Sequence, residues 1–187
     1  LMAVLLHWVW IVLLFMVAGI RARRSPLVLL RNMLPAYLTA LGTMSSAATI
    51  PVALQCSKNN GVSADVANFT VPLFSTIHLS GSTITIVSCA IAVISMQSDL
   101  GIPPLTQIVP FLLTLGIVML AAPGVPGGAV MSAVGLLGSM LGFGESAVAL
   151  MIALYLAQDS FGTACNVTGD GALALILDQQ SHSKHQV

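Results

Sequence analysis

The chain consists of long apolar runs separated by short polar clusters. Residues 1–20 contain one histidine and no charged residue, and about 20 mostly apolar residues form a helix that crosses a bilayer. Residues 65–97 are also long enough to span, although the sequence HLSGS at 78–82 predicts an unwound break there. Residues 145–178 are predicted to form one further spanning helix, about 50 Å long at about 1.5 Å per residue. The pattern therefore predicts an all-α integral membrane protein.

Two pairs of shorter apolar arms lie between these runs. Residues 26–57 turn at the hydroxyl-rich sequence MSSAATIP, and residues 103–142 turn at the glycine- and proline-rich sequence APGVPGG. In the first pair the arm after the turn is too short to cross about 30 Å of hydrocarbon, and the Gly-Pro density of the second turn ends a helix. We expect two re-entrant helical hairpins that enter from opposite faces, as in a secondary transporter. Residues 1–178 form this membrane unit, and residues 179–187 form a polar cytoplasmic tail.

The few charged residues agree with this layout. If both hairpins return to the side from which they came, the basic residues share one side, and Asp99 and Glu145 fall on the other. The basic residues concerned are Arg21, Arg23, Arg24, Lys58 and Lys184. The positive-inside rule places their side in the cytoplasm. The sequence therefore predicts a multi-pass protein of the cell (inner) membrane with a cytoplasmic C-terminus.

Composition agrees with a membrane protein and excludes several other classes. The 187 residues are 57% hydrophobic and only 6% charged, whereas soluble domains are about 25% charged. A formal net charge of zero without a basic block argues against a nucleic-acid partner. The sequence has no nucleophile–base pair, phosphate loop or Cys/His cluster that would predict an enzyme. Because the chain opens directly in an apolar run, we interpret it as a fragment of a longer protein.

Asp159 and Asp170 are the residues that point most directly to chemistry. An ionisable group in a membrane helix costs at least about 2.5 kcal/mol, so two of them indicate a function. Their spacing of 11 residues is close to three helical turns, and Thr163 and Asn166 fall on the same stripe. Such a column suits an amine and a hard cation. The alternative is a polar seam that only holds helices together.

The two predicted hairpin tips and one histidine are further candidates. The tips at Ser45–Ser46 and Gly124–Gly128 leave backbone groups free, and helix N-termini favour a carboxylate while unwound carbonyls favour Na⁺. Each tip taken alone also fits an ordinary tight turn. His78 lies at the predicted break, where it is either a proton carrier or a neutral, hydrogen-bonded ring.

These motifs resemble those of the dicarboxylate/amino acid:cation symporter family, the prokaryotic relatives of glutamate transporters. MSSAATIP (44–51) is similar to the first hairpin tip, and APGVPGG (122–128) to the second. TIHLSGS (76–82) occupies the place of an Asn-Met-Asp-Gly-Thr motif, and DSFGTACNVTGD (159–170) resembles the last-helix motif. The resemblance implies a sodium-coupled, elevator-type carrier, trimeric in the family. This chain would be the C-terminal, transport-domain portion.

The resemblance also implies roles for single residues. Asp159 matches the residue that binds the substrate's amino group, and Gly162 stands where acidic-substrate members place an arginine. Without that guanidinium a second carboxylate has no bidentate partner, so the resemblance implies a neutral substrate. The full set of substrate residues implied is Ser46, Ser82, Val125, Asp159, Gly162, Thr163 and Asn166.

The sodium sites implied by the resemblance are only partly present. Asp170 matches one site together with the backbone of Phe74, His78 and Asn166, and Thr76 matches another. The asparagine and aspartate of the central motif are replaced by His78 and Ser80. We therefore expect fewer coupled sodium ions than the family's full set.

Taken together, the sequence predicts a symporter that moves a small neutral amino acid, similar to serine or threonine, with Na⁺. The alternatives are a proton- or sodium-coupled carrier of dicarboxylates or other organic acids, and a channel-like solute pathway. The expected partners are the substrate, the lipid bilayer and, in the full-length protein, two further copies in a homotrimer.

Overall fold

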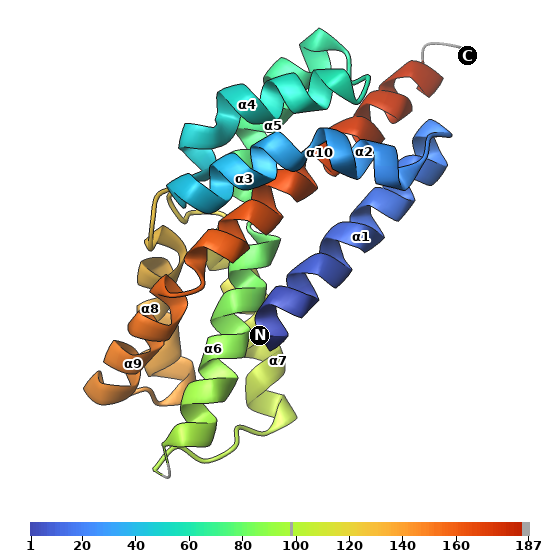
Figure 1. Cartoon of the computed structure of the whole chain (residues 1–187). Coiled ribbons are helices and arrows are strands. Elements are labelled where there is room, and N and C mark those ends of the chain that lie inside the picture. The colour runs from blue at the N-terminus through green and yellow to red at the C-terminus, as the bar shows by residue number, and fades with distance from the viewer. Residues whose placement is uncertain (98, 185–187) are drawn as a thin grey trace.

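Every regular element in the computed structural model is an α-helix within the residues that it describes, 1–97 and 99–184 (Figure 1). The prediction of an all-α membrane protein is confirmed. The helices are α1 (Met2–Ala22), α2 (Pro26–Asn32), α3 (Leu34–Thr43), α4 (Ser46–Asn59), α5 (Ala64–Ile77), α6 (Ser80–Met96), α7 (Leu105–Met119), α8 (Gly128–Leu141), α9 (Glu145–Leu156) and α10 (Asp159–Lys184).

Two segments of the described chain are long and apolar enough to cross a membrane. They are α1 and the α5–α6 pair, and α9 with α10 make a third if the two count as one bent span. The break between α5 and α6 lies at His78 and Leu79, inside the polar sequence that predicts it. At this point the backbone N–H groups that begin α6 need partners from another element.

The last predicted span is wrong as a single helix. The chain bends by 58° between α9 and α10, at Ala157 and Gln158, although neither residue is glycine or proline. The Gln158 side chain donates to the Leu154 carbonyl oxygen at 3.4 Å, which satisfies an acceptor near the end of α9. The bend lets Asp159 begin a new helix, so its carboxylate lies at a helix N-terminus.

α10 continues into the predicted polar tail and ends at Lys184. Asp178 ties this helix to the start of α5. The Asp178 carboxylate accepts hydrogen bonds from the Ser63 backbone N–H at 3.0 Å and the Ser63 hydroxyl at 2.6 Å. Residues 185–187 lie outside the described part of the chain.

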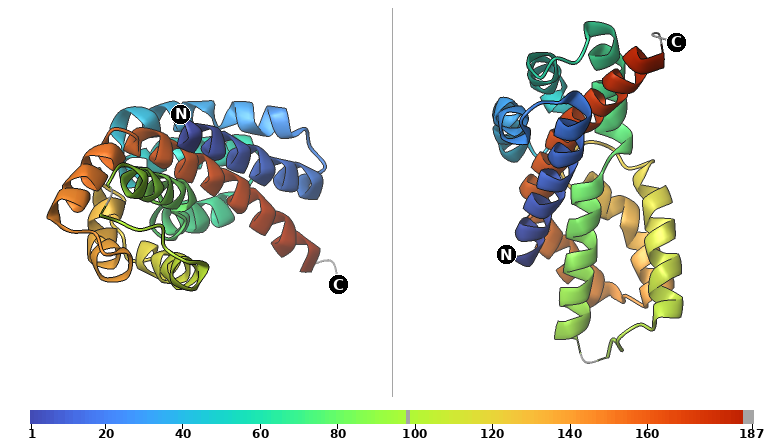
Figure 2. Two further views of the ribbon diagram at one scale, coloured as in Figure 1. Left: turned by 90° about the horizontal axis from the view of Figure 1, so that it is seen from below. Right: turned by 90° about the vertical axis from the view of Figure 1, so that its right-hand side faces the viewer.

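Both predicted hairpins fold back on themselves, with α2 and α3 before the turn of the first and α4 after it, and with α7 and α8 as the two arms of the second. α3 and α4 turn at Met44, in the left-handed conformation (φ 51°), and α7 and α8 are joined through Gly127 (φ 73°). α10 runs beside α1 and crosses the first hairpin, and the second hairpin packs beside α6 and α9 (Figures 1 and 2). The two hairpin tips therefore approach each other near the start of α10.

The segments that carry basic residues end on one side of the structure. Arg24 at the end of α1 donates to the Asn60 carbonyl oxygen after α4 at 3.0 Å, so both segments end on the same side, where α10 also ends (Figure 1). At the opposite end, the Gln97 side chain after α6 donates to the Ser146 hydroxyl of α9 at 3.5 Å. This arrangement agrees with hairpins that return to the side from which they came.

Candidate functional site

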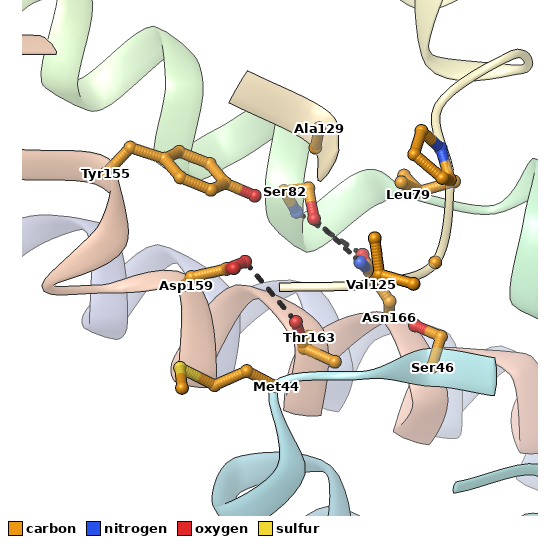
Figure 3. Close-up of a pocket in the computed structure, with 12 residues that line it drawn as sticks. Met44, Ser46, Leu79, Ser82, Val125, Ala129, Tyr155, Asp159, Thr163 and Asn166 are labelled. Atoms are coloured by element: carbon orange, nitrogen blue, oxygen red, sulfur yellow. Dashed lines mark hydrogen bonds between the residues drawn. The ribbon is translucent and has the colours of Figure 1, made fainter. Parts of the chain in front are cut away.

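Six of the seven predicted substrate residues surround one cavity where the hairpin tips meet α6 and α10 (Figure 3). The enclosed space measures only about 10 Å³, roughly what a single water molecule occupies, because the two hairpin tips are closed over it. The six are Ser46, Ser82, Val125, Asp159, Thr163 and Asn166. A ligand can therefore enter only when the hairpin tips separate.

Asp159 is the one charged residue among the described residues that line the cavity. Its side chain is buried (3% exposed). One carboxylate oxygen accepts the Gly127 backbone N–H at 2.7 Å, and the other accepts the Thr163 hydroxyl at 3.4 Å. Gly127 precedes α8 and Asp159 begins α10, so two helix N-termini stabilise the negative charge. A buried carboxylate held in this way can bind an ammonium group.

Asn166 supplies the partners that the start of α6 needs. Its side-chain oxygen accepts the backbone N–H groups of Gly81 at 2.7 Å and Ser82 at 3.3 Å. Its amide nitrogen donates to the Ser82 hydroxyl at 2.9 Å. The side chain of Asn166 thus caps α6 and fixes the Ser82 hydroxyl at the cavity wall.

The hairpin tips are in direct contact over the cavity, and Ser45 makes the contact. Its hydroxyl donates to the Gly124 carbonyl oxygen at 2.9 Å and accepts the Ala48 backbone N–H at 3.2 Å, so it also caps α4. The Ala47 backbone N–H approaches the same Gly124 oxygen at 3.4 Å. Ser46, the residue that the sequence singled out, lines the cavity instead.

We expect Ser45→Ala to open the site. The loss of one cap and one hydrogen bond costs about 1 kcal/mol, which is about fivefold in the balance between touching and separated tips. Because Cys56, Cys89 and Cys165 are all buried, a Ser46→Cys probe can report opening through its rate of modification by a polar maleimide. Thr39→Ala is the control, since the Thr39 hydroxyl bonds only the Pro35 carbonyl of its own helix. Equal modification rates with and without the Ser45→Ala change would show that this bond does not hold the tips.

Gly162, the seventh predicted substrate residue, is not among the described residues that line the cavity, and its role in substrate binding stays a prediction. A Cβ atom on Gly162 would lie 3.0 Å from the Thr85 hydroxyl and 3.4 Å from the Gly81 carbonyl oxygen of α6. A Cβ atom on Gly81 would in turn lie 2.4 Å from the Gly162 carbonyl oxygen. The two glycines therefore allow close approach of α6 and α10.

The second aspartate of the stripe is paired with the histidine at the helix break. The Asp170 side chain is 2% exposed, and one carboxylate oxygen lies 2.8 Å from His78 Nδ1. Gly169 makes room for the ring, because a Cβ atom there would lie 2.7 Å from His78 Cε1. Ser80 is engaged as well, since its hydroxyl accepts the Trp10 indole N–H at 3.0 Å.

The remaining predicted sodium ligands are spread along α5. The Phe74 carbonyl oxygen accepts the His78 backbone N–H at 2.9 Å. The Thr76 hydroxyl donates to the Leu73 carbonyl oxygen of its own helix at 2.7 Å, and Thr76 is exposed. The structure therefore brings the Asp170 carboxylate and His78 together and leaves Thr76 apart from them.

A model of the sodium:dicarboxylate symporter family matches residues 1–180. The chain belongs to this family. It is similar to human excitatory amino acid transporter 5 (31% identical over 159 residues, 83% of this chain and 27% of that protein). Rat excitatory amino acid transporter 1 is 32% identical over 161 residues, 85% of this chain and 29% of that protein. Human excitatory amino acid transporter 3 is 33% identical over 173 residues, 91% of this chain and 32% of that protein. The chain thus spans at most about a third of these relatives.

Membership of the sodium:dicarboxylate symporter family implies sodium coupling, and the donors near Asp170 fit Na⁺ in part. A buried carboxylate is the kind of hard oxygen ligand that such a cation prefers. The His78 ring, however, takes one oxygen of Asp170, and the central motif offers no carboxylate, since Ser80 stands in it. A Na⁺ ion at Asp170 would therefore share the carboxylate with the His78 ring.

Proposed function

We propose that this chain is the substrate-binding part of a symporter that moves a small neutral amino acid across a membrane together with Na⁺. The observation that carries the proposal is the composition of the cavity. One buried carboxylate, Asp159, lies at two helix N-termini, and no lysine or arginine lines the cavity within the described residues. This charge pattern suits one ammonium and one backbone carboxylate.

The substrate's two charged groups have separate partners in this proposal. The ammonium binds the Asp159 carboxylate, which makes only neutral hydrogen bonds within the described residues. The substrate carboxylate binds at the start of α4, where Ser46 lines the cavity and the helix N-terminus favours an anion. Val125 and Ser82 complete the walls.

The family match favours a second candidate, a dicarboxylate carrier. The cavity argues against it, because a second carboxylate would share the cavity with Asp159 without a cationic side chain to pair with it. Two carboxylates inside one small buried cavity repel each other strongly. We therefore rank a neutral amino acid first.

Sodium coupling is assigned to Asp170 in competition with His78. Na⁺ and the His78 ring draw on the same carboxylate, so the ring takes up part of the negative charge and one of the lone pairs that Na⁺ would use. A proton on the ring strengthens the pair, which makes proton coupling the alternative at this site. The segregation of basic residues to one end supports a cell-membrane protein with a cytoplasmic C-terminus, and the resemblance to the family supports a homotrimer.

Uptake into proteoliposomes tests the proposal. With an inward Na⁺ gradient, we expect labelled L-serine to accumulate above its equilibrium level, and an ionophore that removes the gradient should abolish the excess. L-aspartate and succinate should compete poorly. Serine that only equilibrates with an intact gradient would indicate a channel, and preferred uptake of succinate would indicate a dicarboxylate carrier.

A further inference from the structure

Tyr155 is a buried residue of the cavity whose hydroxyl makes no hydrogen bond of normal geometry to any described residue. It lies in the last turn of α9, and its exposed fraction is 0%. Figure 3 shows the hydroxyl pointing into the space between Ser82 and Asp159. A buried hydroxyl without a well-placed partner is unfavourable, so this position calls for a ligand group.

The bend between α9 and α10 places Tyr155 where it can reach a ligand. The two helices meet at 58°, so Tyr155 approaches from α9 while Asp159 begins α10. Asp159 already accepts the Gly127 N–H and the Thr163 hydroxyl, and the Ser82 hydroxyl already accepts the Asn166 amide. The Tyr155 hydroxyl is close enough to Ser82 and Asp159 to interact with both, but it makes no hydrogen bond of normal geometry to either.

We propose that the Tyr155 hydroxyl binds the side-chain hydroxyl of the substrate and so selects hydroxyl amino acids over alanine. The proposal rests on the proposed function, in which Asp159 binds the ammonium of the same molecule. A phenol both donates and accepts a hydrogen bond, as does the hydroxyl of serine or threonine. A methyl group leaves the phenol unpaired, and sites built to bind a hydroxyl discriminate against analogues that lack it.

The neighbours of Tyr155 limit the side chain to a small, uncharged one. A side-chain carboxylate would lie beside Asp159 without a cation. Leu79 and Ala129 form apolar parts of the cavity wall, which suit the carbon atoms of a short side chain. The enclosed space is narrow, about 10 Å³ with the tips closed, which favours a short side chain.

Binding of L-serine and L-alanine to Tyr155→Phe tests the proposal. Both dissociation constants are measured by competition in proteoliposomes containing saturating Na⁺. The preference of the wild type for serine over alanine should fall by about three- to tenfold in the variant, the worth of one hydrogen bond. Tyr37→Phe is the matched control, because Tyr37 packs on Trp8 with ring centroids 5.2 Å apart and lies outside the cavity.

Each outcome bears on the proposal. An equal loss for serine and alanine would show that Tyr155 only positions Asp159, and would overturn the proposal. If Tyr155→Phe does not fold, the wild-type protein still decides, since equal binding of serine and alanine contradicts selection of a hydroxyl. If the wild type binds serine and alanine equally and in a sodium-dependent way, the transport of a neutral amino acid still stands. If it binds neither, the proposed function is wrong as well.

Discussion

Asp159→Asn is expected to weaken substrate binding by about 150- to 4,000-fold, which corresponds to about 3 to 5 kcal/mol. The carboxylate is buried and is the one charge among the described residues that line the cavity. Its removal leaves the substrate's ammonium in a desolvated site without a counter-charge, which costs more than the loss of a single neutral hydrogen bond. The measurement is the dissociation constant of L-serine in saturating Na⁺.

The control for this variant is Asp65→Asn. Asp65 is an exposed aspartate in the first turn of α5, away from the cavity, so the change removes the same charge without touching the site. We expect it to leave serine binding unchanged. Binding to Asp159→Asn that stays within threefold of the wild type would show that Asp159 does not hold the ammonium.

Replacement of Asp170 by asparagine is expected to weaken Na⁺ binding, and replacement of His78 by asparagine is expected to strengthen it. Asp170→Asn should abolish sodium-dependent serine binding, because a desolvated Na⁺ needs a negative ligand. His78→Asn should lower the Na⁺ concentration needed for half-maximal serine binding by about tenfold or more, because it frees the carboxylate oxygen that lies 2.8 Å from the ring. Wild-type serine binding should show a shallow dependence on Na⁺.

The sodium requirement of His78→Asn separates this interpretation from simple packing. An equal Na⁺ concentration for half-maximal serine binding in the wild type and in His78→Asn would show that the His78 ring does not compete with Na⁺ for Asp170.

Local periodicity accounts for what the sequence could predict of the site. Asp159, Thr163 and Asn166 lie on one stripe because a helix repeats every 3.6 residues or so, and the structure places all three at the cavity. The hairpin tips were predictable for a related reason, since proline, glycine and serine mark helix ends within a few residues. These signals need no knowledge of distant parts of the chain.

What the sequence did not predict comes from contacts between distant segments. The bend before Asp159 contains no proline or glycine, so nothing local marks it. The orientation of Gly162 toward α6 depends on how closely α6 and α10 approach. Tyr155 was missed because a tyrosine in an apolar run is usually a packing residue, and its unpaired hydroxyl is visible only once α9 and α10 are placed.

A competition between L-serine and L-glycerate, which carries a hydroxyl in place of the amine, measures directly whether the cavity binds an ammonium on Asp159. In saturating Na⁺ we expect serine to bind at least about 100-fold more tightly, and Asp159→Asn to remove most of that preference. Equal binding of the two ligands, or tighter binding of glycerate, would contradict an amino-acid site in this cavity.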